Sequence, residues 1–179
     1  MALFYNNTQI STANNVYLNS QASNQVFYNN NLVWKKTFQA FPGVTWQHNT
    51  NLNDGGGGWG AESRQTDQVL VLNGGYNGSS AQCALWVDFT PWKTLTINVN
   101  DGTCSYAQFR FGVASGWTNL YGANKIKMWE NNNIVSWNPV GPKSLDISDV
   151  SGGNNIVIYL YSGSTVGANW VHINSVVLS

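Results

Sequence analysis

Two loops of the sequence present aromatic side chains among small and polar residues. Trp59 follows a run of four glycines, and Trp117 and Tyr121 share the segment Gly116-Trp117-Thr118-Asn119-Leu120-Tyr121-Gly122. Proteins bind sugars by stacking the apolar face of the ring on Trp or Tyr, while amide and hydroxyl groups hold its hydroxyls. The predicted ligand-binding residues are Trp59, Arg64, Trp117, Asn119 and Tyr121. Loop tryptophans can also fold back and cap the ends of a core, and the sequence leaves that alternative open.

The acidic and histidine residues give little basis for catalysis. A glycosidase needs two carboxylates facing one cleft. Asp146 and Asp149 flank a strand end and are expected to make turn hydrogen bonds. Among the other acidic residues, only Asp54, Glu62 and Asp67 lie close together, in one long loop. Neither His48 nor His172 has a nucleophile-like neighbour in the sequence. We therefore predict a protein that is not an enzyme and has no catalytic residues or cofactor. A structural calcium held by Asp54, Glu62 or Asp67 with carbonyls of the glycine run is the one metal that the sequence leaves open.

The composition favours a neutral partner. Charged residues make up 9% of the 179 residues, with eight basic and eight acidic side chains, against about 25% in typical domains. Lys35 and Lys36 are the only adjacent like charges, so there is no basic stripe for nucleic acid. The chain contains 9 Trp, 8 Tyr and 7 Phe, which is unlike a disordered protein. The expected partners are a glycan or another copy of the chain, without nucleic acid or membrane insertion.

The start of the sequence has neither the basic residues nor the apolar run of a signal peptide. No apolar stretch approaches the about 20 residues of a membrane-spanning helix. We therefore expect the protein to leave the cell by a route other than ordinary secretion, and release by lysis, as for part of a virion, is one such route.

Alternating apolar and polar residues predict an all-β fold. Turn-forming clusters rich in Gly, Asn, Asp and Pro separate the alternating runs, and no window shows a helical period. Many short strands at this spacing indicate a jelly-roll-like antiparallel β-sandwich over residues 37–179. The expected strands are residues 68–73, 84–89, 94–99, 104–113, 125–130, 133–137, 144–148, 155–161 and 170–178.

The same alternation predicts how some strands pair and face. A three-residue loop at residues 100–102 would place the apolar residues of strands 94–99 and 104–113 on one face of a hairpin. The alternation places Cys104 on the outer face of its strand and Cys83 on the inner face of its strand, so we expect two unpaired thiols. His172 alternates with Val171 and Ile173 and is expected to face solvent.

Two further tryptophans and one strand have structural interpretations. Trp92, beside Pro91, is expected to plug an edge of the core, and neither it nor Trp86 is assigned a function. The strand at residues 156–161 is apolar on both faces, so it should lie under a covering segment or at a subunit contact.

The first 36 residues form a separate segment of imperfect repeats. Short aromatic strands run into Asn-rich turns at residues 4–10, 16–22 and 26–34. A segment this small cannot make its own core, so we expect a β-hairpin arm that packs on the main domain or docks other chains. The predicted oligomerisation or docking residues are Tyr17, Phe27, Tyr28, Trp34, Tyr159 and Tyr161.

Several motifs resemble parts of bacteriophage tail and fibre proteins. Residues 26–36 (VFYNNNLVWKK) resemble short hairpins of those proteins, and residues 86–96 (WVDFTPWKTLT) and 145–153 (LDISDVSGG) are similar to steps in jelly-roll modules of phage receptor-binding proteins. Carbohydrate-binding modules of bacterial glycosidases share this layout. The resemblance implies adhesion or virion structure, often as trimers, and it transfers no binding residue.

The favoured interpretation is a non-catalytic module of a phage tail or fibre that attaches to host-surface carbohydrate, with the arm docking it to other virion proteins. A purely structural virion or fibre-head domain and a bacterial carbohydrate-binding module or lectin are the alternatives. The missing signal peptide weighs against the last of these.

Overall fold

A computed structural model gives the fold. It describes residues 4–5, 8–9, 16–18, 21–23, 25–28, 31–35, 37–50, 60–75, 78–116, 120, 124–131, 137–163 and 169–179; in the first 36 residues only the strands are described. The chain divides into two compact units, Met1–Phe38 with Ser179, and Gln39–Leu178. Within the described residues no helix is long and apolar enough to cross a membrane.

The N-terminal unit contains three short antiparallel hairpins. Their strands coincide with the three repeats of the sequence, because each repeat places aromatic or β-branched residues beside an Asn-rich turn. Tyr17 lies in β3, Phe27 and Tyr28 in β5, and Trp34 in β6; their docking role stays a prediction. The pairs are β1 (Phe4–Tyr5) with β2 (Thr8–Gln9), β3 (Val16–Leu18) with β4 (Gln21–Ser23), and β5 (Gln25–Tyr28) with β6 (Asn31–Lys35).

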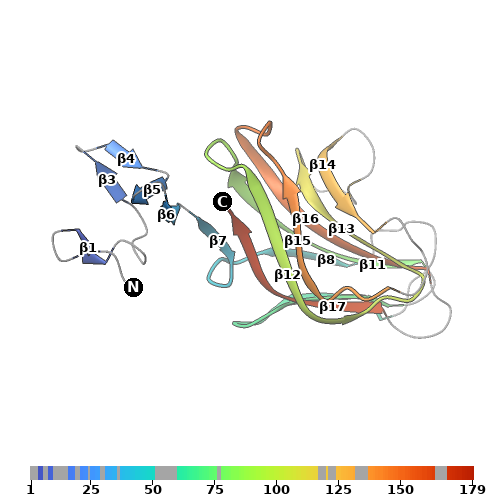
Figure 1. Ribbon diagram of the computed structural model, residues 1–179. Coiled ribbons are helices and arrows are strands. Elements are labelled where there is room, and N and C mark those ends of the chain that lie inside the picture. Colours follow the sequence, from blue (N-terminus) through green and yellow to red (C-terminus); the bar gives the residue numbers. More distant parts are fainter. Residues whose placement is uncertain are drawn as a thin grey trace. The chain divides into compact units, whose positions relative to one another are not determined.

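The second unit is an antiparallel β-sandwich, which confirms the predicted fold class (Figure 1). One sheet has the order β15 (Gly141–Asp146), β12 (Thr94–Thr103), β17 (Asn169–Leu178), β10 (Leu70–Gly75) and β9 (Glu62–Gln65), and β7 (Phe38–Phe41) also pairs with β17. The other sheet has the order β14 (Lys125–Glu130), β13 (Ala107–Ala114), β16 (Gly153–Ser162), β11 (Ser79–Asp88) and β8 (Gln47–Thr50). We call them the six-stranded and the five-stranded sheet.

The core lies between the two sheets, as the alternation of the strands requires. Leu95, Ile97 and Val99 of β12 are 0% exposed, and so are Phe109 and Phe111 of β13. Every second residue of a strand points to the same face, so a strand covered on one side alternates between buried apolar and solvated polar residues. Trp92 is buried at 7% exposure, as predicted for a plug of the core.

The predicted hairpin at residues 100–102 is wrong. β12 continues to Thr103 and pairs with β15 and β17, whereas β13 pairs with β14 and β16 in the other sheet. The chain therefore crosses between sheets just before β13, where Tyr106 has a φ of 53°. Two strands that face each other across a core bury the same alternating pattern as two strands side by side, so the pattern alone did not distinguish them.

The two cysteines are free and buried. Cys83 faces the core as predicted. The predicted outward direction of Cys104 is wrong, because Cys104 is only 3% exposed. The pairing of β12 with β17 shifts register between Asn98 and Val99 and again between Val99 and Asp101. A bulge adds a residue and inverts the alternation beyond it, which turns Cys104 inward.

β16 is the central strand of the five-stranded sheet and is buried on both faces, from Ile156 to Leu160. On the outer face, Val157 belongs to a buried cluster with Ala84, Ala114 and Leu120. The sequence predicted either a covering segment or a subunit contact for this strand. At Val157 there is a covering segment, because Leu120 of the same sandwich packs over this residue.

Candidate functional site

The outer face of the six-stranded sheet presents two aromatic rings side by side. Trp170 and His172 are both half-buried, and their ring centroids lie 4.6 Å apart. Val171 and Ile173, the alternate residues of β17, are 0% exposed. The strand thus buries one side in the core and holds Trp170 and His172 on the other, and the prediction that His172 points outward is confirmed.

The neighbouring strands surround these rings with polar groups. Trp170 pairs with Asn73 of β10 and Thr103 of β12, and His172 pairs with Val71 and Asp101. On the next strand, β9, Glu62 pairs with Asn73 and Arg64 with Val71. We call this set the Trp170 face: Glu62, Arg64, Val71, Asn73, Asp101, Thr103, Trp170 and His172. Strands lie about 4.8 Å apart, so the face extends roughly 14 Å across the sheet.

The Trp170 face carries one guanidinium and two carboxylates, and the guanidinium pairs with one of them. Nε of Arg64 lies 2.6 Å from Oε1 of Glu62, with the two side chains 51% and 49% exposed. Asp101 adds a second exposed carboxylate, and Asn73 accepts a 2.9 Å hydrogen bond from the Gly75 amide through Oδ1. The face therefore offers two adjacent aromatic rings, tilted by 43° to each other, with hydrogen-bond donors and acceptors around them.

A depression of about 400 Å³ lies at the adjacent edge of the sandwich, and Arg64 lines it as well. The Gln65 side chain fixes its wall, because Oε1 accepts from the Trp46 amide at 2.9 Å and Nε2 donates to the Val44 carbonyl at 2.8 Å. A second depression of about 480 Å³ shares Thr45 and Gln65 with the first. Arg64 belongs to the Trp170 face and also lines the first depression, so the edge strand β9 lies between that face and the depression.

His48 and Ser63 form a hydrogen-bonded pair in this depression, and no sequence pattern predicted this pair. Nδ1 of His48 lies 2.8 Å from Oγ of Ser63. Burial lowers the pKa of His48, so its ring is neutral at pH 7. In a catalytic triad a carboxylate orients the second ring nitrogen, but within the described residues the buried Nε2 of His48 has no partner. In the described part of the chain the pair therefore lacks the third member of a triad.

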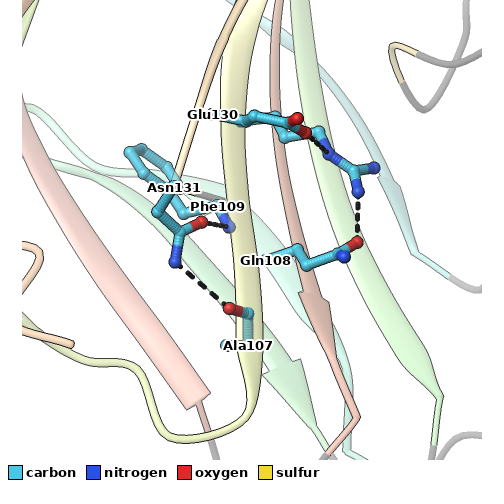
Figure 2. Close-up of polar contacts among 6 residues, drawn as sticks. Ala107, Gln108, Phe109, Glu130 and Asn131 are labelled. Carbon is cyan, nitrogen blue, oxygen red and sulfur yellow. Dashed lines mark hydrogen bonds and ion pairs between the residues drawn. The ribbon is translucent and has the colours of Figure 1, made fainter. Parts of the chain in front are cut away.

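The outer face of the five-stranded sheet carries a buried polar network. Arg110 is 0% exposed; its Nε lies 3.0 Å from Oε2 of Glu130, it also bonds Gln108, and its guanidinium lies 5.5 Å from the Tyr159 ring centre. Figure 2 labels Glu130 and Gln108, the two side chains that bond this guanidinium. These contacts tie the edge strand β14 to β13 and β16.

The structure describes only some of the predicted site residues. Arg64 lies on the Trp170 face, whereas Trp59, Trp117, Asn119 and Tyr121 fall outside the described residues, so their binding role stays a prediction. Leu120, between them in sequence, is 0% exposed.

Of the two predicted docking residues in the sandwich, Tyr161 is half-buried. Tyr159 is 1% exposed, so in this structure its ring contacts the chain's own residues and offers no surface to a partner.

Three candidate residues were missed from the sequence. Trp170 was not singled out, His172 was assigned only a solvated position, and Trp86 was assigned no function although it is 66% exposed. The alternation of the strands could have predicted that both tryptophans face outward, since Trp170 and Trp86 each share a face with a polar residue two positions away.

No metal site emerges from the described part of the chain, where no group of three or more His, Cys, Asp or Glu side chains could hold an ion. Glu62 is paired with Arg64, and Asp54 falls outside the described residues, so the structural calcium that the sequence left open stays untested.

The fold and site define a two-sheet β-sandwich with an aromatic, polar outer face. No protein-family model and no curated protein matches the sequence. Among solved structures, a low-affinity xylan-binding module, CBM86 from Roseburia intestinalis, matches with a TM-score of 0.49 and 16% identity, over 80% of this chain and 93% of that chain. TmCBM61, solved in complex with β-1,4-galactotriose, matches with a TM-score of 0.45 and 12% identity, over 75% and 87% of the two chains. The glycoside hydrolase domain of Endo-D from Streptococcus pneumoniae R6 matches with a TM-score of 0.42 and 12% identity, over 83% of this chain and 22% of that chain.

Proposed function

We propose that this protein is a non-catalytic carbohydrate-binding module and that the Trp170 face is its binding surface. The observation that carries the proposal is the adjacent pair of rings on β17, Trp170 and His172, held on a rigid sheet with centroids 4.6 Å apart. An aromatic ring with an apolar face can stack on the C–H face of a sugar. The surrounding carboxylates, guanidinium, amide and hydroxyl can then hold the sugar hydroxyls.

The charge balance of the face favours a neutral ligand over nucleic acid. Arg64 is its one permanent cation, and it is already paired with Glu62. Asp101 lies opposite His172 and would repel phosphate. Phosphate backbones are bound by clusters of uncompensated Lys and Arg, which this face does not offer.

The experiment is a calorimetric titration with soluble xylan, β-1,4-galactan, β-glucan and mannan, compared between the native chain and Trp170→Ala. We expect at least one polysaccharide to bind and the variant to lose affinity by about tenfold, which corresponds to about 1.4 kcal/mol. The melting temperature should change little, because Trp170 lies on the outer face of its strand. Tyr106→Asn is the control, since Tyr106 is 58% exposed elsewhere on the sandwich and Asn tolerates a positive φ. If the folded native chain bound none of these polysaccharides, the proposal would be refuted.

The setting that we propose for this module is a phage tail or fibre, where it would attach to host-surface carbohydrate. The support is the resemblance of residues 26–36, 86–96 and 145–153 to phage proteins, together with the N-terminal hairpins as an arm for docking to other virion proteins or for trimerisation. Binding of labelled protein to intact bacterial cells, competed by free cell-wall polysaccharide, is the expected result. Binding to plant polysaccharide without any binding to cells would instead favour a bacterial carbohydrate-binding module.

A further inference from the structure

Trp86 is a strongly exposed aromatic residue on the sheet opposite to the Trp170 face. Trp86 is 66% exposed, compared with 58% for Tyr106 and 44% for Ile126. It lies on the outer side of β11, because the alternate residue Val87 is only 8% exposed.

The Trp86 ring packs against the backbone of Gly153 on the neighbouring strand. A Cβ placed on Gly153 would lie 2.2 Å from Cζ2 of Trp86, so the ring rests directly on the backbone of that glycine. The turn at Gly152 is bonded to the segment that follows β11, since the Phe89 amide donates to the Gly152 carbonyl at 2.9 Å and the Gly152 amide donates to Oγ1 of Thr90 at 3.1 Å. A ring held in this way loses little conformational freedom when a ligand stacks on it.

Polar groups border the ring. Asp88 follows Trp86 on the same face, and Asn155 pairs with Trp86 across the strands. Hydrogen bonds from Thr90 lower the pKa of Asp88, and an aspartate is already a carboxylate at neutral pH. Both of those bonds reach Oδ1, from the Thr90 amide at 3.0 Å and from its hydroxyl at 2.7 Å. A stacking ring, a charged acceptor and an amide therefore meet at one place.

The surroundings favour a sugar over a protein partner. A stable protein interface buries about 800 Å² on each side, with an apolar centre. Ile126 is the only other large hydrophobic residue exposed on the described part of this sheet, and its strand β14 is separated from β11 by β13 and β16. One aromatic ring bordered by Asp88, Thr90 and Asn155 matches the size and polarity of a sugar residue instead.

We propose that Trp86, seated on Gly153 and bordered by Asp88 and Asn155, is a second sugar-stacking platform, which makes the module bivalent. This inference rests on the proposed carbohydrate-binding function. The outer faces of the two sheets of a sandwich point in opposite directions, so one sugar cannot contact both Trp86 and Trp170. Each module would therefore join two polysaccharide chains, or two segments of one chain.

The test uses the full chain and the polysaccharide that binds best among soluble xylan, β-1,4-galactan, β-glucan and mannan. Its short oligosaccharides give the stoichiometry by calorimetry, and the intact polysaccharide reports cross-linking as turbidity. The native chain should bind two oligosaccharides per chain and raise turbidity. Trp86→Ala and Trp170→Ala should each bind one and raise no turbidity, and the double variant should bind none. Light scattering without sugar must give the same protein mass for all variants, so that oligomerisation is not mistaken for bivalency.

Gly153→Ala provides an independent check, because it keeps Trp86 but displaces its ring. It should reduce binding at the Trp86 site about as much as Trp86→Ala, whereas Tyr106→Asn should bind like the native chain. If the native chain binds one oligosaccharide and Trp86→Ala leaves this binding unchanged, the second platform is refuted while the proposed function stands. If the native chain binds no polysaccharide, both are refuted.

Discussion

Gln82 is a buried side chain whose amide makes no hydrogen bond to the described residues. It is 0% exposed, and neither Oε1 nor Nε2 has a partner within the described residues. A buried polar group left unsatisfied costs about 1–3 kcal/mol. Gln82→Met keeps the length of the side chain and removes the amide, so we expect the free energy of unfolding in urea to rise by about 1 kcal/mol or more. Gln82→Ala should lower it through the cavity that it leaves. A loss of stability in Gln82→Met would show that the amide has a partner, such as an ordered water.

The two buried thiols make stability depend on alkaline pH. Burial raises the pKa of Cys83 well above its usual range, and it raises the pKa of Cys104 to about 12 despite the nearby charge of Lys143. In the unfolded chain a thiol ionises above about pH 8.5. The unfolded state then holds fewer protons than the native state, so stability is full below that pH and falls as the pH rises towards the native pKa values.

We expect each cysteine to lower the free energy of unfolding by about 2 kcal/mol between pH 8 and pH 10. Urea titrations at pH 7.5, 8, 9 and 10 measure this slope. The Cys83→Ala and Cys104→Ala double variant is the comparison, and its slope should be much flatter. Equal slopes for the two proteins would mean that the thiols ionise in the native state as well.

The residue patterns show how far the site could be predicted from the sequence. Arg64 was predicted to bind ligand and lies on the Trp170 face, and the outward direction of His172 was correct. The face was missed as a site because Glu62, Asn73 and Trp170 come from three strands, and their proximity depends on a pairing register that no single strand encodes. Trp86 was missed for a different reason, since only the glycine on the neighbouring strand shows that the ring is seated rather than buried.

At the scale of elements, Asn131 holds the end of the edge strand β14 on β13. Its Oδ1 accepts from the Phe109 amide at 2.7 Å, and its Nδ2 donates to the Ala107 carbonyl at 3.2 Å. Figure 2 shows this amide lying along the backbone of β13, just beyond the ion pair of Glu130. The side chain thus continues the ladder of hydrogen bonds after the strand has ended.

Asn131→Ala should lower the free energy of unfolding by about 1–3 kcal/mol, because it leaves the Phe109 amide without this acceptor. Hydrogen exchange at that amide should accelerate. Asn131→Asp keeps the acceptor and loses only the donor, so its loss should be smaller. Polysaccharide affinity at the Trp170 face should not change, since β14 belongs to the other sheet. Unchanged exchange at Phe109 in the alanine variant would contradict this role.

The strands themselves were largely predictable, but their partners were not. The alternation of Leu95, Ile97 and Val99 correctly indicated a half-buried strand, and it says nothing about which strand lies beside it. The register shifts within β12 inverted the face of Cys104, and local propensity gives no sign of such bulges. The sandwich therefore follows from the periodicity, whereas the strand order follows from packing across the whole chain.

At the scale of the molecule, the balance of eight basic and eight acidic residues fits recognition by stacking and hydrogen bonds. Such contacts are screened little by salt, in contrast to ion pairs. Bivalency compensates for weak individual contacts, because the second binding event on one polysaccharide occurs at a high effective concentration. Two faces that each bind a sugar modestly can thus give a module firm attachment to a polymer.

The division into two compact units predicts that the sandwich is independent of the N-terminal hairpins. The described strands of the sandwich pair only with one another, so deletion of residues 1–36 should leave the melting temperature within a few degrees of the native value. If the hairpins form the proposed trimerisation arm, light scattering should show a trimer for the full chain and a monomer after the deletion. Affinity for a short oligosaccharide should be the same in both proteins, whereas attachment to bacterial cells should weaken, because avidity across three chains is lost. A trimer that persists after the deletion would move the subunit contact onto the sandwich, and an unfolded product would show that the hairpins complete its core.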